Sequence, residues 1–227
     1  MALKLVVFDL DGTLIDTIED LGNAVNHALA SSSLPLHGTE EYRTMVGHGV
    51  RNLVRQALPE ALRDSEEEVD RHLSLFIDYY SAHIADCSCP YPGIPELLAE
   101  LDAMGVKLAV ASNKFHSGTL ALVSLFFPAV GFVSVEGNRP GALLKPDAGI
   151  IRSAVDAAGL CEEDLSSVVM VGDSATDVLT GHNAGVRSIA VSWGFRSRDS
   201  LVRAGADAVV DNVACLRDLL LESAAQV

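Results

Sequence analysis

Acidic side chains stand at two places in this sequence where an apolar run ends. Asp9 and Asp11 close an apolar, β-branched run that begins at Leu3, and Asp173 follows a second run, Val168–Val171. Carboxylate oxygens are the ligands that Mg²⁺ prefers in proteins. A carboxylate beside such a metal is also a usable nucleophile, because it can form an aspartyl phosphate. The three acids therefore predict magnesium-assisted phosphoryl chemistry.

Other residues in similar positions could bind the phosphoryl group itself. Ser112 and Asn113 follow the apolar run Val106–Ala111, and Lys145 stands just before a helical segment. Lys145 would supply a positive point charge, and Ser112 a hydrogen bond to a phosphoryl oxygen. The backbone amides of the turn at Gly12 would add further donors for an anion.

The elements that must position these residues alternate regularly after residue 91. Apolar runs typical of strands alternate with amphipathic segments typical of helices, and several glycines stand where helix C-caps belong. This pattern predicts an α/β, Rossmann-like fold, a parallel sheet with helices on both faces. Ligands bind at the carboxyl ends of such strands, where these polar residues stand. After the strand at Leu3–Leu10, the expected strands are Val106–Ala111, Val130–Val135, Val168–Val171, Ser188–Val191 and Ala208–Val210, and the expected helices are Ile94–Met104, Gly118–Phe126, Ala148–Ala158, Thr176–Ala184, Leu201–Ala204 and Cys215–Ser223.

The block between residues 16 and 87 differs, because its apolar pattern is helical and shows no clear strand. Leu21, Val25 and Leu29, for example, recur at the spacing of one helix face. Pro90 and Pro92 interrupt helical structure just after this block. We therefore expect an α/β catalytic core of residues 1–15 and 88–227, with residues 16–87 inserted after the first strand as a helical cap.

Composition excludes several other classes of protein. The chain has 227 residues, of which 49% are hydrophobic and 21% charged, as in soluble globular proteins. Its net charge of −15 disfavours nucleic acid and anionic membrane surfaces as partners. No apolar stretch approaches the ~18 residues of a membrane span, and no signal peptide is evident. We expect a cytoplasmic monomer or homodimer whose four cysteines are free thiols.

Taken together and in order, the motifs resemble those of the haloacid dehalogenase-like (HAD) phosphohydrolases. The resemblance covers almost the whole chain, including a helical cap placed directly after the first motif. The residues that carry it are Asp9-Leu10-Asp11-Gly12-Thr13, Ser112-Asn113, Lys145-Pro146 and Gly172-Asp173-Ser174-Ala175-Thr176-Asp177.

The resemblance implies a role for each of these side chains. Asp9 would be the nucleophile, and Asp11 the general acid for the leaving alcohol and then the base for water. Mg²⁺ would be held by the Asp9 side chain, the Asp11 backbone carbonyl and Asp173. Asp177 would orient metal-bound water or Lys145, unless it is only a first-turn helix acid. The residues expected to bind phosphate are Ser112, Asn113 and Lys145.

Within the family, the residues favour some reactions over others. Dehalogenases lack an acid at the position of Asp11, and pumping ATPases place a lysine after their nucleophile and need a membrane domain. Phosphonatases use a cap lysine, but this chain has none between Asp16 and Tyr91. A phosphatase or a phosphomutase remains.

One cap segment bears on the substrate. Gly47 and Gly49 permit a tight loop with exposed amides around His48, and Arg51 or Arg43 could pair with a carboxylate. This stretch resembles the glycine-containing cap loop of phosphoglycolate phosphatases, although it could equally be a turn that opens a helix beside a surface arginine. We expect a small phosphorylated metabolite, foremost 2-phosphoglycolate, as substrate. The alternatives are a β-phosphoglucomutase-like phosphotransferase and a non-catalytic phosphometabolite sensor.

Overall fold

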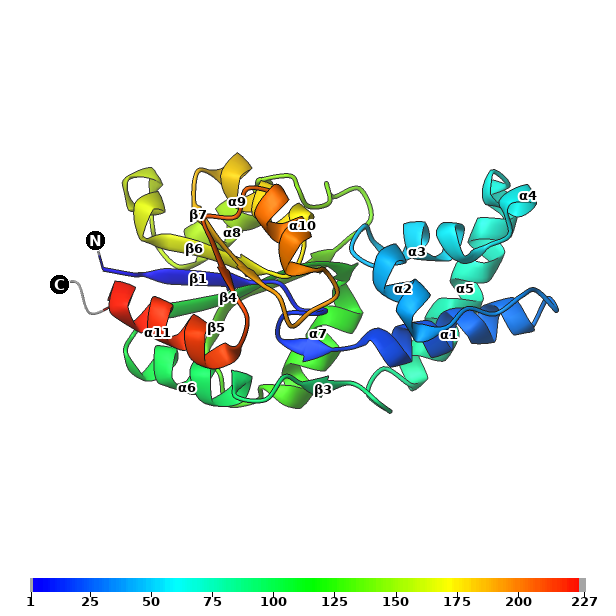
Figure 1. The fold of residues 1–227 in the computed structure, drawn as a ribbon, viewed down its shortest axis with the longest axis horizontal. Coiled ribbons are helices and arrows are strands. Elements are labelled where there is room, and N and C mark those ends of the chain that lie inside the picture. The colour runs from blue at the N-terminus through cyan, green and yellow to red at the C-terminus, as the bar shows by residue number, and fades with distance from the viewer. Residues whose placement is uncertain (1, 225–227) are drawn as a thin grey trace.

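The protein is described by a computed structural model that covers residues 2–224. Six parallel strands form its main sheet, in the order β5-β4-β1-β6-β7-β8. The first strand in sequence therefore lies near the middle of the sheet, as the predicted α/β fold requires (Figure 1). The strands are β1 (Leu5–Phe8), β4 (Lys107–Phe115), β5 (Phe132–Asn138), β6 (Val168–Gly172), β7 (Arg187–Val191) and β8 (Ala208–Val210).

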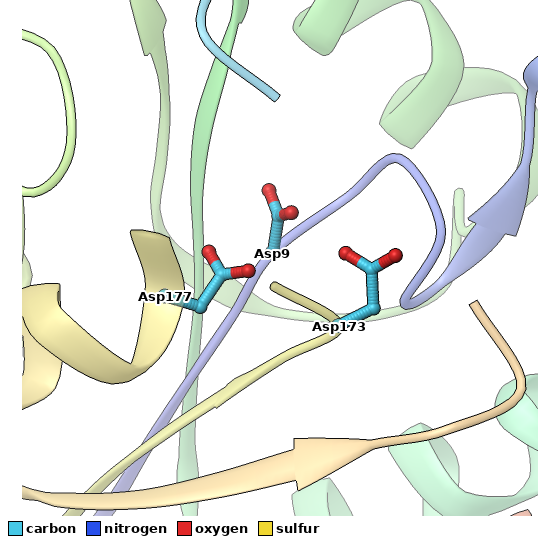
Figure 2. Close-up of side chains that lie close together, drawn as sticks. All are labelled: Asp9, Asp173 and Asp177. Atoms are coloured by element: carbon cyan, nitrogen blue, oxygen red, sulfur yellow. The ribbon is translucent and has the colours of Figure 1, made fainter. Parts of the chain in front are cut away.

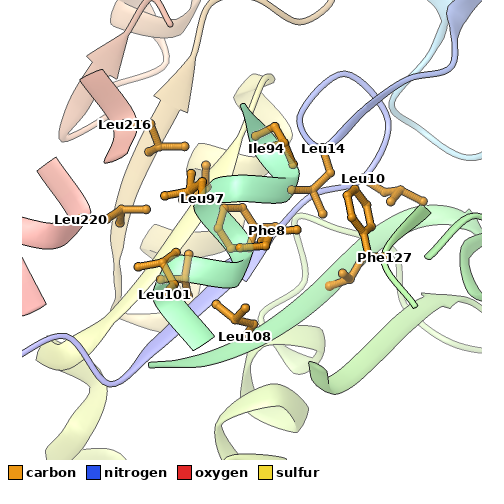
Figure 3. Packing of buried hydrophobic residues seen from close by; sticks show 14 of the residues in the cluster. Phe8, Leu10, Leu14, Ile94, Leu97, Leu101, Leu108, Phe127, Leu216 and Leu220 are labelled. Atoms are coloured by element: carbon orange, nitrogen blue, oxygen red, sulfur yellow. The ribbon is translucent and has the colours of Figure 1, made fainter. Parts of the chain in front are cut away.

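Helices cover both faces of this sheet, because side chains along each strand alternate between the two faces. Val6 and Phe8 pack in one apolar cluster with α6, α7 and α11, and Figure 3 shows Phe8 among leucines of α6. Leu5 and Val7 pack in the opposite cluster with α8 and the end of α9. The bounds are α6 (Ile94–Ala103), α7 (His116–Phe126), α8 (Gly149–Ala157), the 3₁₀-helix η1 (Glu162–Ser167), α9 (Ala175–Ala184), α10 (Arg198–Arg203) and α11 (Val213–Ala224).

Five helices between β1 and the rest of the sheet form a separate body at one end of the molecule (Figure 1). They enclose their own apolar cluster, in which Phe76 and Tyr80 are fully buried. The structure thus has helices where the sequence predicted a cap. They are α1 (Ile18–Ala30), α2 (Thr39–Met45), α3 (Val50–Ala57), α4 (Glu60–Arg63) and α5 (Glu66–Ala82).

The two chain crossings between these bodies lie side by side. β2 (Ile15–Asp16) pairs antiparallel with β3 (Cys89–Pro90). Beside them the buried Asp20 carboxylate accepts hydrogen bonds from the backbone amides of Cys87 and Ser88 and from the Ser88 hydroxyl, the last at 2.6 Å. This ladder was not expected from the sequence, because a strand of two residues shows no periodicity.

Several predicted boundaries differ by a few residues, and the end of β4 differs most. The apolar run predicted a strand that ends at Ala111, whereas β4 continues to Phe115. Its pairing with β5 is irregular between Ala111 and Phe115. The polar motif Ser112-Asn113 therefore lies inside the last, distorted part of a strand. The sequence could not predict this longer strand, because polar residues usually end a buried strand. Here Ser112 and Asn113 are buried by contacts with other parts of the chain.

No helix in the described part of the chain combines the length and the apolarity that crossing a membrane requires. All four cysteines are unpaired and exposed.

Candidate active site

A cavity of about 50 Å³ lies between the carboxyl ends of the strands and the cap. The cap side of its lining is largely apolar, with Leu21, Val46, Leu53 and Phe76. The core side is polar. It contains every core residue that the sequence singled out: Asp9, Asp11, Ser112, Asn113, Lys145, Asp173 and Asp177.

Three of these carboxylates form one cluster. Asp9, Asp173 and Asp177 each offer an oxygen, and these oxygens all lie within 4.8 Å of one another (Figure 2). All three residues are buried. Burial, together with the charge of Asp177, raises the pKa of Asp9 to about 7 and the pKa of Asp173 well above its usual range. Buried hard oxygens that repel one another fit a divalent cation such as Mg²⁺.

The carboxylate of Asp11 faces different partners. It accepts a hydrogen bond from the Thr17 hydroxyl at 2.7 Å. It also forms an ion pair with Lys114, whose Nζ donates to Asp11 Oδ1 at 3.1 Å. Among the described residues it is not part of the three-carboxylate cluster. The metal contact expected through the Asp11 backbone carbonyl therefore stays a prediction, as does the role of the side chain in proton transfer.

Lys145 connects two members of the cluster. Its Nζ lies 2.8 Å from Asp9 Oδ1 and donates hydrogen bonds to Asp177 Oδ1 at 2.7 Å and to the Ala111 carbonyl at 2.8 Å. Burial alone would lower the pKa of Lys145, but Asp177 and Asp9 together outweigh this and raise it. The ammonium is therefore charged and fixed beside the expected nucleophile.

Asp177 combines both roles that the sequence left open. Its second oxygen accepts hydrogen bonds from the Ser174 amide at 3.0 Å and the Ser174 hydroxyl at 2.6 Å, which closes a capping box on α9. The same carboxylate holds Lys145 through its other oxygen. A first-turn helix acid is thus also the group that positions the lysine.

Two glycines and a backbone amide lie against the carboxylate of Asp173. Gly12 has a φ of +85°, and a side chain there would collide with Asp173. A side chain at Gly194 would collide with Asp173 and with the Gly12 carbonyl. The amide of Phe195 donates to Asp173 Oδ2 at 2.6 Å. The loop after β7 therefore helps to orient this carboxylate, a role that the sequence analysis missed.

Asn113 connects the core to the cap. Its side-chain oxygen accepts a hydrogen bond from the Lys145 amide at 2.8 Å, and its Nδ2 donates to the carbonyls of Gly47 at 2.9 Å and Lys145 at 3.1 Å. The side chain thus holds backbone on both sides of the cavity. Ser112, also expected to bind phosphate, is buried in the lining, and its hydroxyl accepts a hydrogen bond from the Lys114 amide at 3.2 Å.

The cap loop matches expectation in part. Gly47 and Gly49 have φ values of +118° and +81° and both line the cavity. His48 is exposed and is absent from the lining. Arg51 is also absent from the lining within the described chain, because its guanidinium pairs with two acids of α5, Glu66 and Asp70. The structure therefore does not place Arg51 where it could contact a ligand in the cavity.

The cavity lining also contains two cationic residues, Lys114 and Arg196, that were not predicted from the sequence. Lys114 comes from β4, directly after Ser112-Asn113, and its side chain is 2% exposed. Arg196 follows β7, and its guanidinium donates to the cap carbonyls of Arg43 and Val46. A lysine near a strand end and an arginine in a loop are usually solvated, so only the contacts that each makes in the fold distinguish these two.

Comparison with known proteins agrees with this geometry. The family model described as haloacid dehalogenase-like hydrolase matches residues 6–191. The chain belongs to this family. It is 38% identical to the phosphoglycolate phosphatase of Mesorhizobium japonicum, over 87% of this chain and 86% of the relative. It is 39% identical to the phosphoglycolate phosphatase of Caulobacter vibrioides, over 90% and 85%.

Solved structures support the same fold. A protein of Lactobacillus delbrueckii subsp. bulgaricus, assigned as a phosphoglycolate phosphatase, has a TM-score of 0.89 and 32% identity, with 97% of this chain and 99% of that one covered. CbbY from Rhodobacter sphaeroides, solved in complex with phosphate, has a TM-score of 0.77 and 26% identity over 94% and 96% of the two chains. The resemblance indicated by the four motifs is confirmed, and these names support a phosphatase.

Proposed function

We propose that this protein is a magnesium-dependent phosphomonoester hydrolase of small metabolites, with 2-phosphoglycolate as its substrate. One observation carries the proposal. Asp9, held by Lys145, and Asp11, held by Lys114, face the same buried cavity from different environments. Two carboxylates in different environments can act as nucleophile and as acid–base catalyst in one reaction.

We expect hydrolysis of the phosphate ester to proceed in two steps. The carboxylate of Asp9 attacks phosphorus, the bond between phosphorus and the ester oxygen breaks, and Asp11 gives its proton to the departing alcohol. Asp11 then takes a proton from water, whose oxygen attacks phosphorus and releases Asp9 and inorganic phosphate. We expect Ser112 and Lys145 to bind phosphoryl oxygens from the cavity lining, Lys145 by turning towards the phosphoryl group the N–H that now faces Asp9.

The carboxylate cluster is the proposed magnesium site. Asp9, Asp173 and the backbone carbonyl of Asp11 would hold the ion, and Asp177 would act through Lys145. When bound, Mg²⁺ supplies positive charge that offsets repulsion between the carboxylates and an incoming phosphate.

The proposed substrate class is supported by the small size of the cavity and by the names of related proteins. A cavity of about 50 Å³ under an apolar cap favours a small leaving group over a hexose. The relatives from Mesorhizobium japonicum and Caulobacter vibrioides are named phosphoglycolate phosphatases. We also propose a cytoplasmic protein that acts alone or as a homodimer.

A phosphate-release screen in the presence of Mg²⁺ tests this proposal. The panel contains 2-phosphoglycolate, hexose phosphates, nucleotides and pyrophosphate. We expect the highest kcat/KM for 2-phosphoglycolate and loss of all release in excess chelator. A flat and weak profile would contradict the substrate. Conversion of glucose 1-phosphate without phosphate release would indicate the mutase, and no turnover of any kind would indicate a sensor.

A further inference from the structure

Lys114 is a buried cation whose position the mechanism above does not use. Its Nζ lies 3.1 and 3.4 Å from the two oxygens of Asp11 and donates to the Tyr80 hydroxyl at 2.6 Å. The ammonium also lies 4.5 Å from the centre of the Tyr80 ring. Burial lowers the pKa of Lys114, and the charge of Asp11 opposes this shift. The side chain therefore joins the core to cap helix α5 next to the expected acid–base catalyst.

The partners of Lys114 leave one donor unused. An ammonium group has three N–H bonds. The two oxygens of one carboxylate lie too close together, as seen from Nζ, to accept from two different N–H bonds of the ammonium. Asp11 therefore takes one N–H donor and the Tyr80 hydroxyl takes another. Lys145 differs, because Asp9, Asp177 and the Ala111 carbonyl take all three of its donors. Within the described chain, Lys114 Nζ has no acceptor group other than Asp11 and Tyr80, and Lys114 lines the cavity.

The location of Lys114 indicates which part of a substrate it would meet. Lys145 lies against Asp9, on the side where the phosphoryl group must bind. Lys114 lies against Asp11, which must reach the ester oxygen of the leaving alcohol. A substituent on the carbon that bears this oxygen is thus the part of the substrate nearest to the free donor of Lys114.

We propose that Lys114 is the specificity residue of this site and binds a carboxylate on the carbon adjacent to the ester oxygen, as in phosphate esters of 2-hydroxy acids. A buried ammonium gains most from an anionic acceptor, because a charge-assisted hydrogen bond is stronger than a neutral one. The cap side chains in the lining, among them Leu21 and Phe76, are apolar. The Arg196 guanidinium, which also lines the cavity, already donates to two carbonyls of the cap. This inference rests on the proposed hydrolysis of 2-phosphoglycolate.

The test compares two esters that differ at the proposed contact. Wild type and Lys114→Met are assayed with 2-phosphoglycolate and with 2-hydroxyethyl phosphate, in which a neutral hydroxymethyl group replaces the carboxylate. For the wild type we expect a clear preference for 2-phosphoglycolate. For Lys114→Met we expect kcat/KM for 2-phosphoglycolate to fall about 10- to 100-fold, mainly through KM. The value for the neutral ester should fall by a clearly smaller factor, because only the support of Asp11 is lost there, so that the preference for 2-phosphoglycolate disappears.

Lys107→Met is the matched control, because Lys107 is an exposed lysine at the opposite end of the same strand. It should keep the wild-type preference. An equal loss on both esters in Lys114→Met would show that Lys114 only supports Asp11, and would overturn the inference while leaving the proposed function intact. If Lys114→Met does not fold, the wild-type ratio still decides, since equal kcat/KM values for the two esters would exclude carboxylate recognition. Wild type without activity on 2-phosphoglycolate would refute the proposed function, and the inference with it.

Discussion

Asp9 and Asp11 are identical side chains two positions apart, and their neighbours determine what each can do. Asp9 lies in a buried cluster of carboxylates against Lys145. Asp11 contacts a hydroxyl, that of Thr17, and Lys114 instead. Differences of this kind separate a nucleophile from an acid–base catalyst. The motif Asp-x-Asp was visible in the sequence, but the lysine that belongs to each acid was not.

The raised pKa of Asp9 makes stability depend on pH when no divalent metal is bound. Its ordinary value is 3.8 and its value in the fold is about 7. The folded protein therefore holds this proton more tightly than the unfolded chain does, and the resulting stability is lost as the pH rises through about 7. The pKa of Asp173 shifts in the same direction.

Urea unfolding in chelator should show this effect. We expect the free energy of unfolding to fall between pH 4.5 and 7 by on the order of 1 kcal/mol per pH unit. Asp9→Asn should reduce the slope, because it removes the titrating group. Excess Mg²⁺ should also flatten the slope, since a bound cation favours ionised carboxylates. A metal-free protein that becomes more stable over this range would contradict the assignment.

At the scale of elements, the strands, helices and loops around the sheet differ in how well the sequence predicted them. Buried strands such as Val168–Gly172 were recognisable because both of their faces are covered and the run is continuously apolar. The last part of β4 was not, because Asn113 and Lys114 are polar and are stabilised there by partners more than 30 residues away in the chain. Long-range pairing of polar groups has no local signal.

The loop after β7 was missed for the same reason. Phe195 donates its amide to Asp173 while its ring packs with the apolar cluster of the cap, and the Arg43 guanidinium lies 5.6 Å from the ring centre. Arg196 donates to the carbonyls of Arg43 and Val46. One loop thus fixes an expected metal ligand and holds the cap over the cavity.

Arg196→Met should therefore weaken the enclosure of the substrate. We expect kcat/KM for 2-phosphoglycolate to fall about 10-fold, because two hydrogen bonds from a charged group to the cap are lost. Faster amide hydrogen exchange in residues 43–50 should accompany the loss. Arg198→Met is the control, because Arg198 pairs with Asp211 outside the cavity. If both variants show the same activity and the same exchange, the loop does not hold the cap.

In the molecule as a whole, two bodies meet over one cavity. The α/β core and the cap have separate apolar clusters. Polar contacts join them through Asn113, Lys114 and Arg196. The core carries the groups expected to act on phosphorus, and we expect the cap to enclose the remainder of the substrate. A chain with a net charge of −15 needs such a local concentration of cations to bind an anion.

The proposed mechanism requires that Asp9 be transiently phosphorylated during turnover. The direct measurement is rapid acid quenching of the enzyme with Mg²⁺ and 2-phosphoglycolate, followed by peptide mass spectrometry. We expect one added phosphoryl group on Asp9 that appears before steady state and is absent from Asp9→Asn. Phosphorylation of a different residue, or steady turnover by Asp9→Asn, would contradict the proposed mechanism.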